Sequence, residues 1–169
     1  TTQADVAAST NLTGATALGG DWTLEVATGR IESQLAFTLT TQVHYAGVLD
    51  TIEVTTELDV VDGDTSSIAA LLANLGADNA LSLREAIEAA NNTSGTDDIT
   101  FLGSLPNTFT LTQGPLSITD SLAIHGQNVA NLTIANAGAD VFLVTGAGTH
   151  FTIGDLSIDG TLTVEDGAS

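Results

Sequence analysis

Three aspartates, Asp59, Asp62 and Asp64, lie close to Gly63 in a short acidic segment. Carboxylate oxygens on a tight loop are hard ligands of the kind that Ca²⁺ prefers. The spacing is not that of an EF-hand loop, so the pattern alone does not define a calcium site. The segment has two interpretations: a calcium site formed by the three aspartates, or an ordinary acidic turn.

Polysaccharide cleavage is the second chemistry to consider. It needs paired carboxylates, or Ca²⁺ together with a basic residue that abstracts a proton. Asp155 and Asp159 form an acidic pair, but both lie in turn contexts, and residues 99–169 contain neither Lys nor Arg. The histidines His44, His125 and His150 are widely spaced and show no ligand pattern. We therefore predict no catalytic residue and no cofactor other than Ca²⁺ at the acidic segment.

The charge of the chain limits its partners. Its 169 residues include 21 acidic and 2 basic side chains, Arg30 and Arg84, which gives a formal net charge of −19. Such a chain repels phosphate backbones and anionic lipid headgroups, so we exclude nucleic-acid binding and electrostatic membrane binding. No apolar run approaches the roughly 20 residues of a membrane helix. The charge is interpreted as a solubility device, a high-salt adaptation or a reservoir of Ca²⁺ ligands.

A helix start is the clearest local signal in the sequence. Ser82 and Glu85 have the spacing of a capping box, in which each side chain accepts a hydrogen bond from the other residue's backbone N–H. The helix that follows places Leu83 and Ile87 on one apolar face. Arg84 lies on another face, and we expect it to form a structural ion pair with Glu88 or with a loop carboxylate.

Two flanking regions complete the local prediction. Apolar residues at helical spacing predict a further helix over 67–75, which Gly76 ends. Residues 1–58 are predicted to be β-rich, because apolar and polar residues alternate over 22–26 and 35–39 between glycine-containing turns.

Residues 99–169 repeat a triplet in which apolar residues usually enclose a small or polar one. The copies lie at 116–118, 122–124, 132–134, 142–144, 151–153, 156–158 and 162–164. Turns rich in Gly, Asn and Asp separate them, for example over 136–140. Such closely spaced short strands favour a solenoid whose coils carry two or three strands each. A β-sandwich is the alternative, and it is less favoured because long strands are missing and aromatic residues make up only 4% of the chain.

Four stretches resemble a known family, the CSLREA-type module. They are residues 54–56, 59–62, 81–91 and 98–101, within a match that covers about residues 52–101. Leu81 stands where that family usually has Cys, which loses a thiol and keeps an apolar residue before the helix. The module is found in large secreted and surface proteins of bacteria and archaea, at the start of right-handed parallel β-helices. The resemblance implies the same architecture here.

The expected role of this module is to cap the β-helix. The open apolar end of a parallel β-helix needs a cover, and an amphipathic helix supplies one while it blocks edge-to-edge pairing. The predicted cap residues are Ser82, Leu83, Arg84, Glu85 and Ile87.

Residues 4–50 carry a second, weaker resemblance. The stretches 4–9, 19–25 and 28–32 are similar to the tail of a domain near the N-terminus of giant bacterial adhesin-like proteins. The upstream part of that domain has a His-Gly and a Cys reminiscent of caspase-like peptidases. Neither element is present in this chain, so that activity is not carried over.

Together these observations predict a mainly β chain with three parts. They are a β-rich segment over 1–51, a capping module over 52–101 and right-handed parallel β-helix coils over 102–169. The expected function is a non-catalytic structural or adhesive segment of an extracellular or cell-surface protein. The alternatives are a self-assembling filament subunit, joined through open β-helix ends or strand exchange, and a fragment of a polysaccharide-active enzyme.

The end of the sequence bears on the expected partners. It lacks a recognisable cap after Val164, and an uncapped end exposes unpaired backbone. We therefore expect either a longer natural chain or self-association there, with a surface glycan or protein as a further partner.

Overall fold

The computed structural model describes residues 7–8, 13–14, 22–23, 26–27, 48–49, 51–126 and 128–169. The chain divides into two compact units, Thr1–Asp50 and Thr51–Ser169. The boundary predicted after residue 101 falls inside the second unit.

Short antiparallel strand pairs are described in the first unit. β1 (Ala7–Ala8) pairs with β3 (Val26–Ala27), and β2 (Thr13–Gly14) pairs with β4 (Val48–Leu49). The strand predicted over 22–26 overlaps β3 at Val26. The strand predicted over 35–39 and His44 lie outside the described residues.

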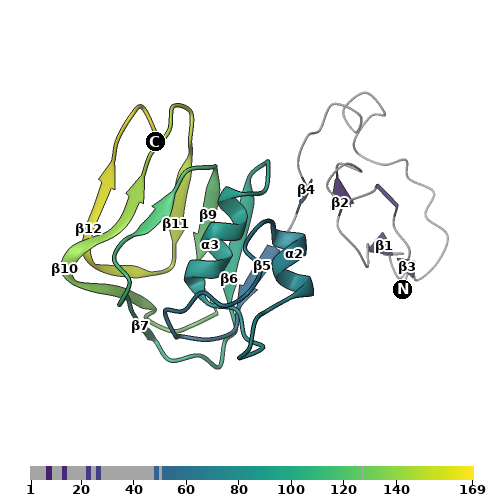
Figure 1. The fold of residues 1–169 in the computed structure, drawn as a ribbon, viewed down its shortest axis with the longest axis horizontal. Coiled ribbons are helices and arrows are strands. Elements are labelled where there is room, and N and C mark those ends of the chain that lie inside the picture. The colour runs from purple at the N-terminus through teal and green to yellow at the C-terminus, as the bar shows by residue number, and fades with distance from the viewer. Residues whose placement is uncertain are drawn as a thin grey trace, which may run out of the picture. The chain divides into compact units, whose positions relative to one another are not determined.

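Parallel strands form the first sheet of the second unit (Figure 1). The strands are β5 (Thr51–Val54), β6 (Asp97–Phe101), β9 (Leu122–His125) and β11 (Phe151–Gly154). They lie in the order β11-β9-β6-β5, and each neighbouring pair is parallel. Apolar residues occupy alternate positions, so each strand turns one face towards the core.

The second sheet is organised around one long strand. Its members are β7 (Thr108–Thr110), β8 (Leu116–Ile118), β10 (Thr133–Val144) and β12 (Ser157–Val164). β12 runs parallel to both halves of β10, while β7 pairs with the first half and β8 with the second. The register shifts between the halves, where Ala137 and Gly138 have φ values of 45° and 80°. The turn predicted over 136–140 is therefore a bend within one strand.

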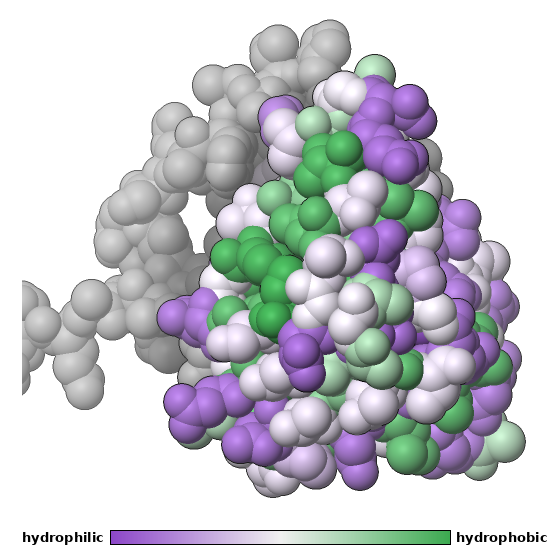
Figure 2. Space-filling view, turned by 90° about the vertical axis from the view of Figure 1, so that its left-hand side faces the viewer, coloured by the Kyte–Doolittle hydropathy of each residue, from purple (hydrophilic) through white to green (hydrophobic). Residues whose placement is uncertain are grey.

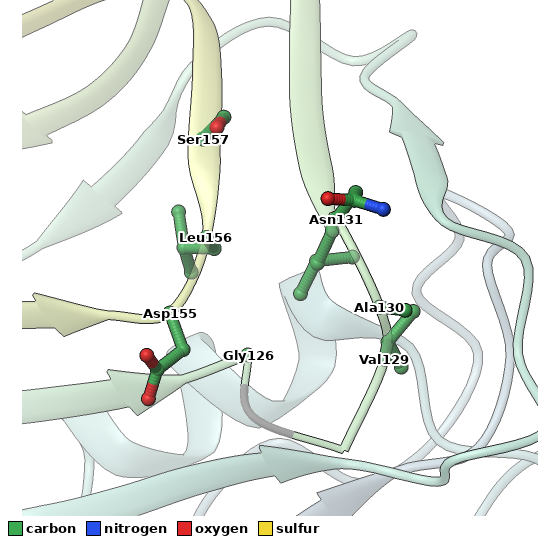
Figure 3. A pocket seen from close by; sticks show the side chains of 8 residues that line it. Gly126, Val129, Ala130, Asn131, Asp155, Leu156 and Ser157 are labelled. Atoms are coloured by element: carbon green, nitrogen blue, oxygen red, sulfur yellow. The ribbon is translucent and has the colours of Figure 1, made fainter.

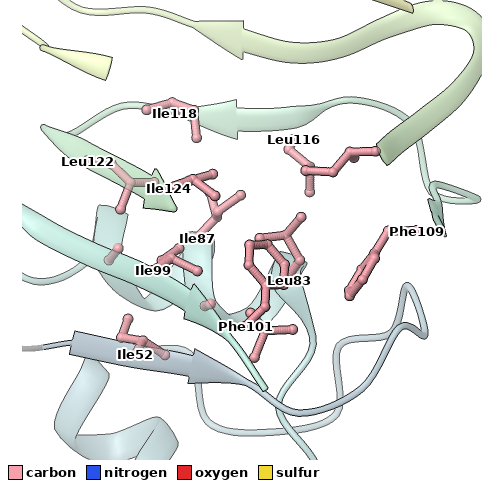
Figure 4. Close-up of a cluster of buried hydrophobic side chains, with 14 of the residues drawn as sticks. Ile52, Leu83, Ile87, Ile99, Phe101, Phe109, Leu116, Ile118, Leu122 and Ile124 are labelled. Carbon is pink, nitrogen blue, oxygen red and sulfur yellow. The ribbon is translucent and has the colours of Figure 1, made fainter. Parts of the chain in front are cut away.

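Matching apolar side chains stack across these parallel pairs, and the buried ones form the core (Figure 4). One column contains Ile52, Ile99, Ile124 and Ile153. The other columns are Phe109, Ile134 and Ile158; Leu116, Phe142 and Leu162; and Ile118, Val144 and Val164. Burial decreases along the last column, since Ile118 and Val144 are 0% exposed and Val164 is 49% exposed.

Two helices lie between β5 and β6 in the described chain. α2 (Ile68–Ala73) begins after Ser67, whose hydroxyl accepts a hydrogen bond from the Ala70 N–H. α3 (Leu83–Asn91) begins after Ser82 and packs against α2, β5, β6 and β8. Leu83 and Ile87 of α3 are 3% and 1% exposed, so the predicted apolar face is buried.

The second unit is thus mainly β, with parallel sheets and two described helices, as the sequence predicts. The strand pairs described within residues 51–169 are parallel, which argues against the β-sandwich alternative because sandwiches pack antiparallel sheets. Among the described residues, no helix is both long enough and apolar enough to cross a membrane.

Candidate functional site

The predicted capping box is present at the start of α3. The Ser82 hydroxyl accepts from the Glu85 N–H at 3.2 Å, and Glu85 Oε2 accepts from the Ser82 N–H at 3.0 Å. Glu85 is 0% exposed. Its other oxygen, Oε1, accepts from the N–H groups of Asp62 and Gly63, each at 2.8 Å. Glu85 therefore also fixes the acidic segment against the helix, a contact that the capping-box pattern does not predict.

Arg84 forms an ion pair with a loop carboxylate. Its Nε and Nη2 atoms donate to Asp59 Oδ1 and Oδ2 at 2.7 and 3.1 Å. Nη1 also donates to the Pro115 carbonyl at 3.1 Å, and Nη2 to the Gly114 carbonyl at 2.8 Å. Of the two partners expected from the sequence, Asp59 and not Glu88 is thus the residue that these hydrogen bonds join to Arg84.

Asp59 also binds the backbone that precedes β8. Its Oδ2 atom accepts from the N–H groups of Thr112 and Gln113 at 2.6 and 2.8 Å. Burial acts to raise the pKa of Asp59, but the hydrogen bonds from Arg84, Thr112 and Gln113 outweigh it and hold the pKa below its ordinary value. The carboxylate is therefore stabilised in its charged form.

Asn91, at the end of α3, binds the backbone at and after β8. Its Nδ2 donates to the Ser117 carbonyl at 2.8 Å. Its Oδ1 accepts from the N–H groups of Thr119 and Asp120 at 2.8 and 3.3 Å. A side-chain amide offers both donors and an acceptor, so it can replace a neighbouring strand. The sequence does not predict this contact, because no local pattern indicates that Asn91 binds a distant strand.

These contacts define the capped edge, which is the outer backbone of residues 112–120 held by Asp59, Arg84 and Asn91. Polar groups at a sheet edge offer a template for pairing with other chains. Side chains from the loop and from α3 occupy those groups here. Residues of the predicted capping module, Asp59, Arg84 and Asn91, thus hold backbone that the sequence assigns to the first β-helix coils.

The three aspartates of the hypothetical calcium site have different partners. Asp62 Oδ2 accepts from the N–H groups of Ala77 and Asp78 at 2.7 and 3.3 Å. Hydrogen bonds from Ser66 hold the pKa of Asp64 below its ordinary value. In the part of the chain that the structure describes, no group of three or more His, Cys, Asp or Glu residues is arranged to hold a metal ion. The structure does not bring Asp59, Asp62 and Asp64 together, and calcium binding there stays a prediction.

At the other end of the stack lies the β12 face, formed by Ser157–Val164 with Leu156. Leu162 is 40% exposed and Val164 is 49% exposed, while Leu156 and Ile158 are partly buried. β11 and β12 each end the strand order of their sheet among the described strands. Figure 2 shows hydrophobic side chains gathered on the side of the molecule where β12 lies in Figure 1. The β12 face therefore differs from the capped edge, because it presents apolar side chains that the other described residues leave partly exposed.

A groove of about 550 Å³ lies between two connections of the second unit (Figure 3). Its lining residues are Gly126, Val129, Ala130, Asn131, Leu132, Asp155, Leu156 and Ser157. Asp155, in the connection from β11 to β12, therefore lines the groove, whereas Asp159 lies within β12. The acidic pair considered for catalysis is thus divided between two environments.

The described histidines form separate surface pairs. His125 Nε2 lies 3.2 Å from Asp98 Oδ1. His150 Nδ1 lies 2.6 Å from Ser169 Oγ. The two described imidazoles thus contact different residues.

Comparison with known proteins adds one family match. Residues 1–49 are similar to a domain of unknown function, DUF4347. No curated protein and no solved structure matches the chain. The family match lies before residues 52–101, so their CSLREA-type resemblance stays a prediction.

Proposed function

We propose that this chain is a non-catalytic structural or adhesive segment of an extracellular cell-surface protein. In this proposal residues 51–169 begin a right-handed parallel β-helix, and α3 with the capped edge is its N-terminal cap. The observation that carries the proposal is the column register of the core, in which matched residues of successive passes of the chain stack in parallel.

The path of the chain supports coils rather than independent sheets. The chain runs through β6, β7 and β8, then through β9 and the two halves of β10, and then through β11 and the two halves of β12. Each pass returns to the same ladders in the same order. Stacked repeats of this kind bury a continuous core between neighbours, and the exposed ends need caps.

The chemistry of the charged residues supports a non-catalytic role. Positions 51–169 contain one Arg, Arg84, and no Lys. The Arg84 guanidinium is held by Asp59 and by the carbonyls of Gly114 and Pro115. A guanidinium held in this way supports the cap and is not free to bind a substrate.

An extracellular location is proposed from the resemblance of residues 52–101 and from the composition. The chain has no Lys and no Cys and carries a net charge of −19. A strongly acidic surface keeps a protein soluble and separate from anionic membranes.

Electron microscopy of the purified chain, together with an assay for newly released reducing ends, tests this proposal. We expect single particles and no product from neutral or uronate polysaccharides. Fibres would support the filament alternative, in which the β12 face pairs with another copy. Product release that is lost on Asp155→Asn would support the enzyme alternative and overturn the proposed role.

A further inference from the structure

The groove beside Gly126 and residues 129–132 arises from a mismatch between two connections. The connection from β9 to β10 spans residues 126–132, whereas Asp155 and Leu156 alone connect β11 to β12. Connections of such different length cannot stack residue upon residue, and a groove of about 550 Å³ is left between them. Known ligand sites have volumes of roughly 300–1,000 Å³, so the groove is large enough for a small ligand or a segment of a chain.

The base of the groove is fixed by close backbone packing. The Gly126 N–H donates to the Gly154 carbonyl at 2.9 Å. A Cβ atom at Gly126 would lie 2.5 Å from the Asp155 carbonyl oxygen, so a larger residue would force the two connections apart. The backbone at Gly126 and Asp155 is therefore held at a fixed close separation at the base of the groove.

Polar groups and apolar groups both line the walls. Figure 3 shows Asn131 on one wall and Asp155 and Ser157 on the other. These side chains supply an amide, a carboxylate and a hydroxyl, which together accept and donate hydrogen bonds. Leu156, which is partly buried, adds apolar surface. A sugar ring has the same mixture, because its hydroxyls form hydrogen bonds and its C–H groups pack against aliphatic side chains.

The charge of the groove restricts the class of ligand further. Among the described residues that line the groove, Asp155 alone is charged. Arg84, the single Lys or Arg residue of positions 51–169, is bound to Asp59 at the capped edge. A uronate or a phosphorylated chain would meet a carboxylate with no counter-charge, and the net charge of −19 would repel it as it approached.

We propose that this groove binds a neutral polysaccharide chain. The proposal rests on the adhesive role proposed above and names the ligand class for it. Asp155 accepts hydrogen bonds from sugar hydroxyls, Asn131 and Ser157 fix the orientation of the ring, and Leu156 contacts its apolar face. Hydrogen bonds to a charged acceptor are the stronger ones in such a site.

Amide NMR spectra of the isotope-labelled chain provide the test. The probes are neutral oligosaccharides of glucose, mannose or N-acetylglucosamine, with oligogalacturonate as the anionic probe. We expect at least one neutral probe at millimolar concentration to shift the amide signals of residues 126–132 and 155–157, and oligogalacturonate to shift none of them. Asp155→Asn should lower the affinity about tenfold, since a charge-assisted hydrogen bond is weakened.

Asp155→Asn suits this test because Asp155 has a φ of 55°, a conformation that Asn also adopts readily. Asp159→Asn is the matched control, because Asp159 is an exposed aspartate of β12 outside the groove lining. The proposal is overturned if no neutral probe shifts these signals, or if Asp159→Asn weakens binding as much as Asp155→Asn. Either result leaves the parallel stack and its cap intact, so it is distinct from a failure of the proposed structural role.

Discussion

The capped edge and the β12 face close the same stack of strands in different ways. At the capped edge, side chains of Asp59, Arg84 and Asn91 occupy backbone groups of residues 112–120. On the β12 face, Leu162 and Val164 are 40% and 49% exposed. The first end has polar side chains in place of a missing strand, and the second presents apolar side chains and a strand edge.

This comparison indicates which end of the stack contributes more to the free energy of unfolding. α3 buries its apolar face and two charged residues, since Arg84 is 9% exposed and Glu85 is 0% exposed. Buried charges are tolerated where they are paired or hydrogen-bonded, and losing one partner is strongly destabilising. Substitutions at the capped edge should therefore lower the free energy of unfolding far more than substitutions on the β12 face.

Ile87→Asp should have the largest effect. Ile87 is 1% exposed on the core face of α3, so the substitution buries a carboxylate without a partner. We expect the free energy of unfolding to fall by more than about 4 kcal/mol, or the chain not to fold at all. Urea unfolding followed by circular dichroism measures the change. Leu72→Asp is the control, since Leu72 of α2 is 48% exposed and the same substitution should be nearly neutral there.

Arg84→Met should have the next largest effect and lower the free energy of unfolding by about 3 kcal/mol. It leaves the Asp59 carboxylate and the carbonyls of Gly114 and Pro115 without their donor. The double variant Arg84→Met with Asp59→Asn should recover part of the loss, because it no longer leaves a buried charge alone. A double variant less stable than Arg84→Met would contradict this account of the pair.

Substitutions in the capping box should lower the free energy of unfolding by less, and by different amounts at Ser82 and Glu85. Ser82→Ala should cost about 1 kcal/mol, through the loss of the N-cap hydrogen bond from Glu85 and of the hydrogen bond that the Ser82 hydroxyl donates to the Val60 carbonyl. Glu85→Ala should cost about 2 kcal/mol, because the Glu85 carboxylate accepts from the N–H groups of Ser82, Asp62 and Gly63. Melting curves of both variants show which one loses more stability. If Ser82→Ala were the more damaging, the contact of Glu85 with the acidic segment would have little energetic weight.

The lowered pKa of Asp59 predicts a pH dependence at the capped edge. A carboxyl whose pKa is lower in the folded state stabilises the fold above its unfolded-state pKa, and that contribution is lost as the pH falls through the folded-state pKa. The stability difference between the unmodified chain and Asp59→Asn should therefore be largest near neutral pH and shrink in acid. Comparing the two chains removes the general effect of protonating the other acidic residues. A difference that stays constant down to strongly acidic pH would show that the charge of Asp59 is not stabilising.

Local sequence patterns predicted the parts of this fold that depend on near neighbours. The capping box of α3 is present where the spacing of Ser82 and Glu85 places it, and the triplets lie at strands or strand ends. The pairing of Arg84 with Asp59 and the contact of Asn91 with β8 join residues far apart in sequence. Their partners depend on how the elements pack, which no local spacing encodes. For the same reason the groove beside Asp155 could not be predicted, since it arises where two connections of unequal length meet.

The column Ile118, Val144 and Val164 provides the most direct test of the contrast between the ends. Val144 is 0% exposed and Val164 is 49% exposed, although both belong to the same column. Val→Thr keeps the shape of the side chain and adds a hydroxyl, which is costly only where water is excluded. Val144→Thr should therefore lower the free energy of unfolding by about 2 kcal/mol, and Val164→Thr by less than about 0.5 kcal/mol. Urea unfolding at several protein concentrations, with light scattering of the same samples, measures both values. An equal loss at the two positions would mean that the β12 face is covered in solution, and a loss at Val164 that grows with protein concentration would identify the cover as a second copy of the chain.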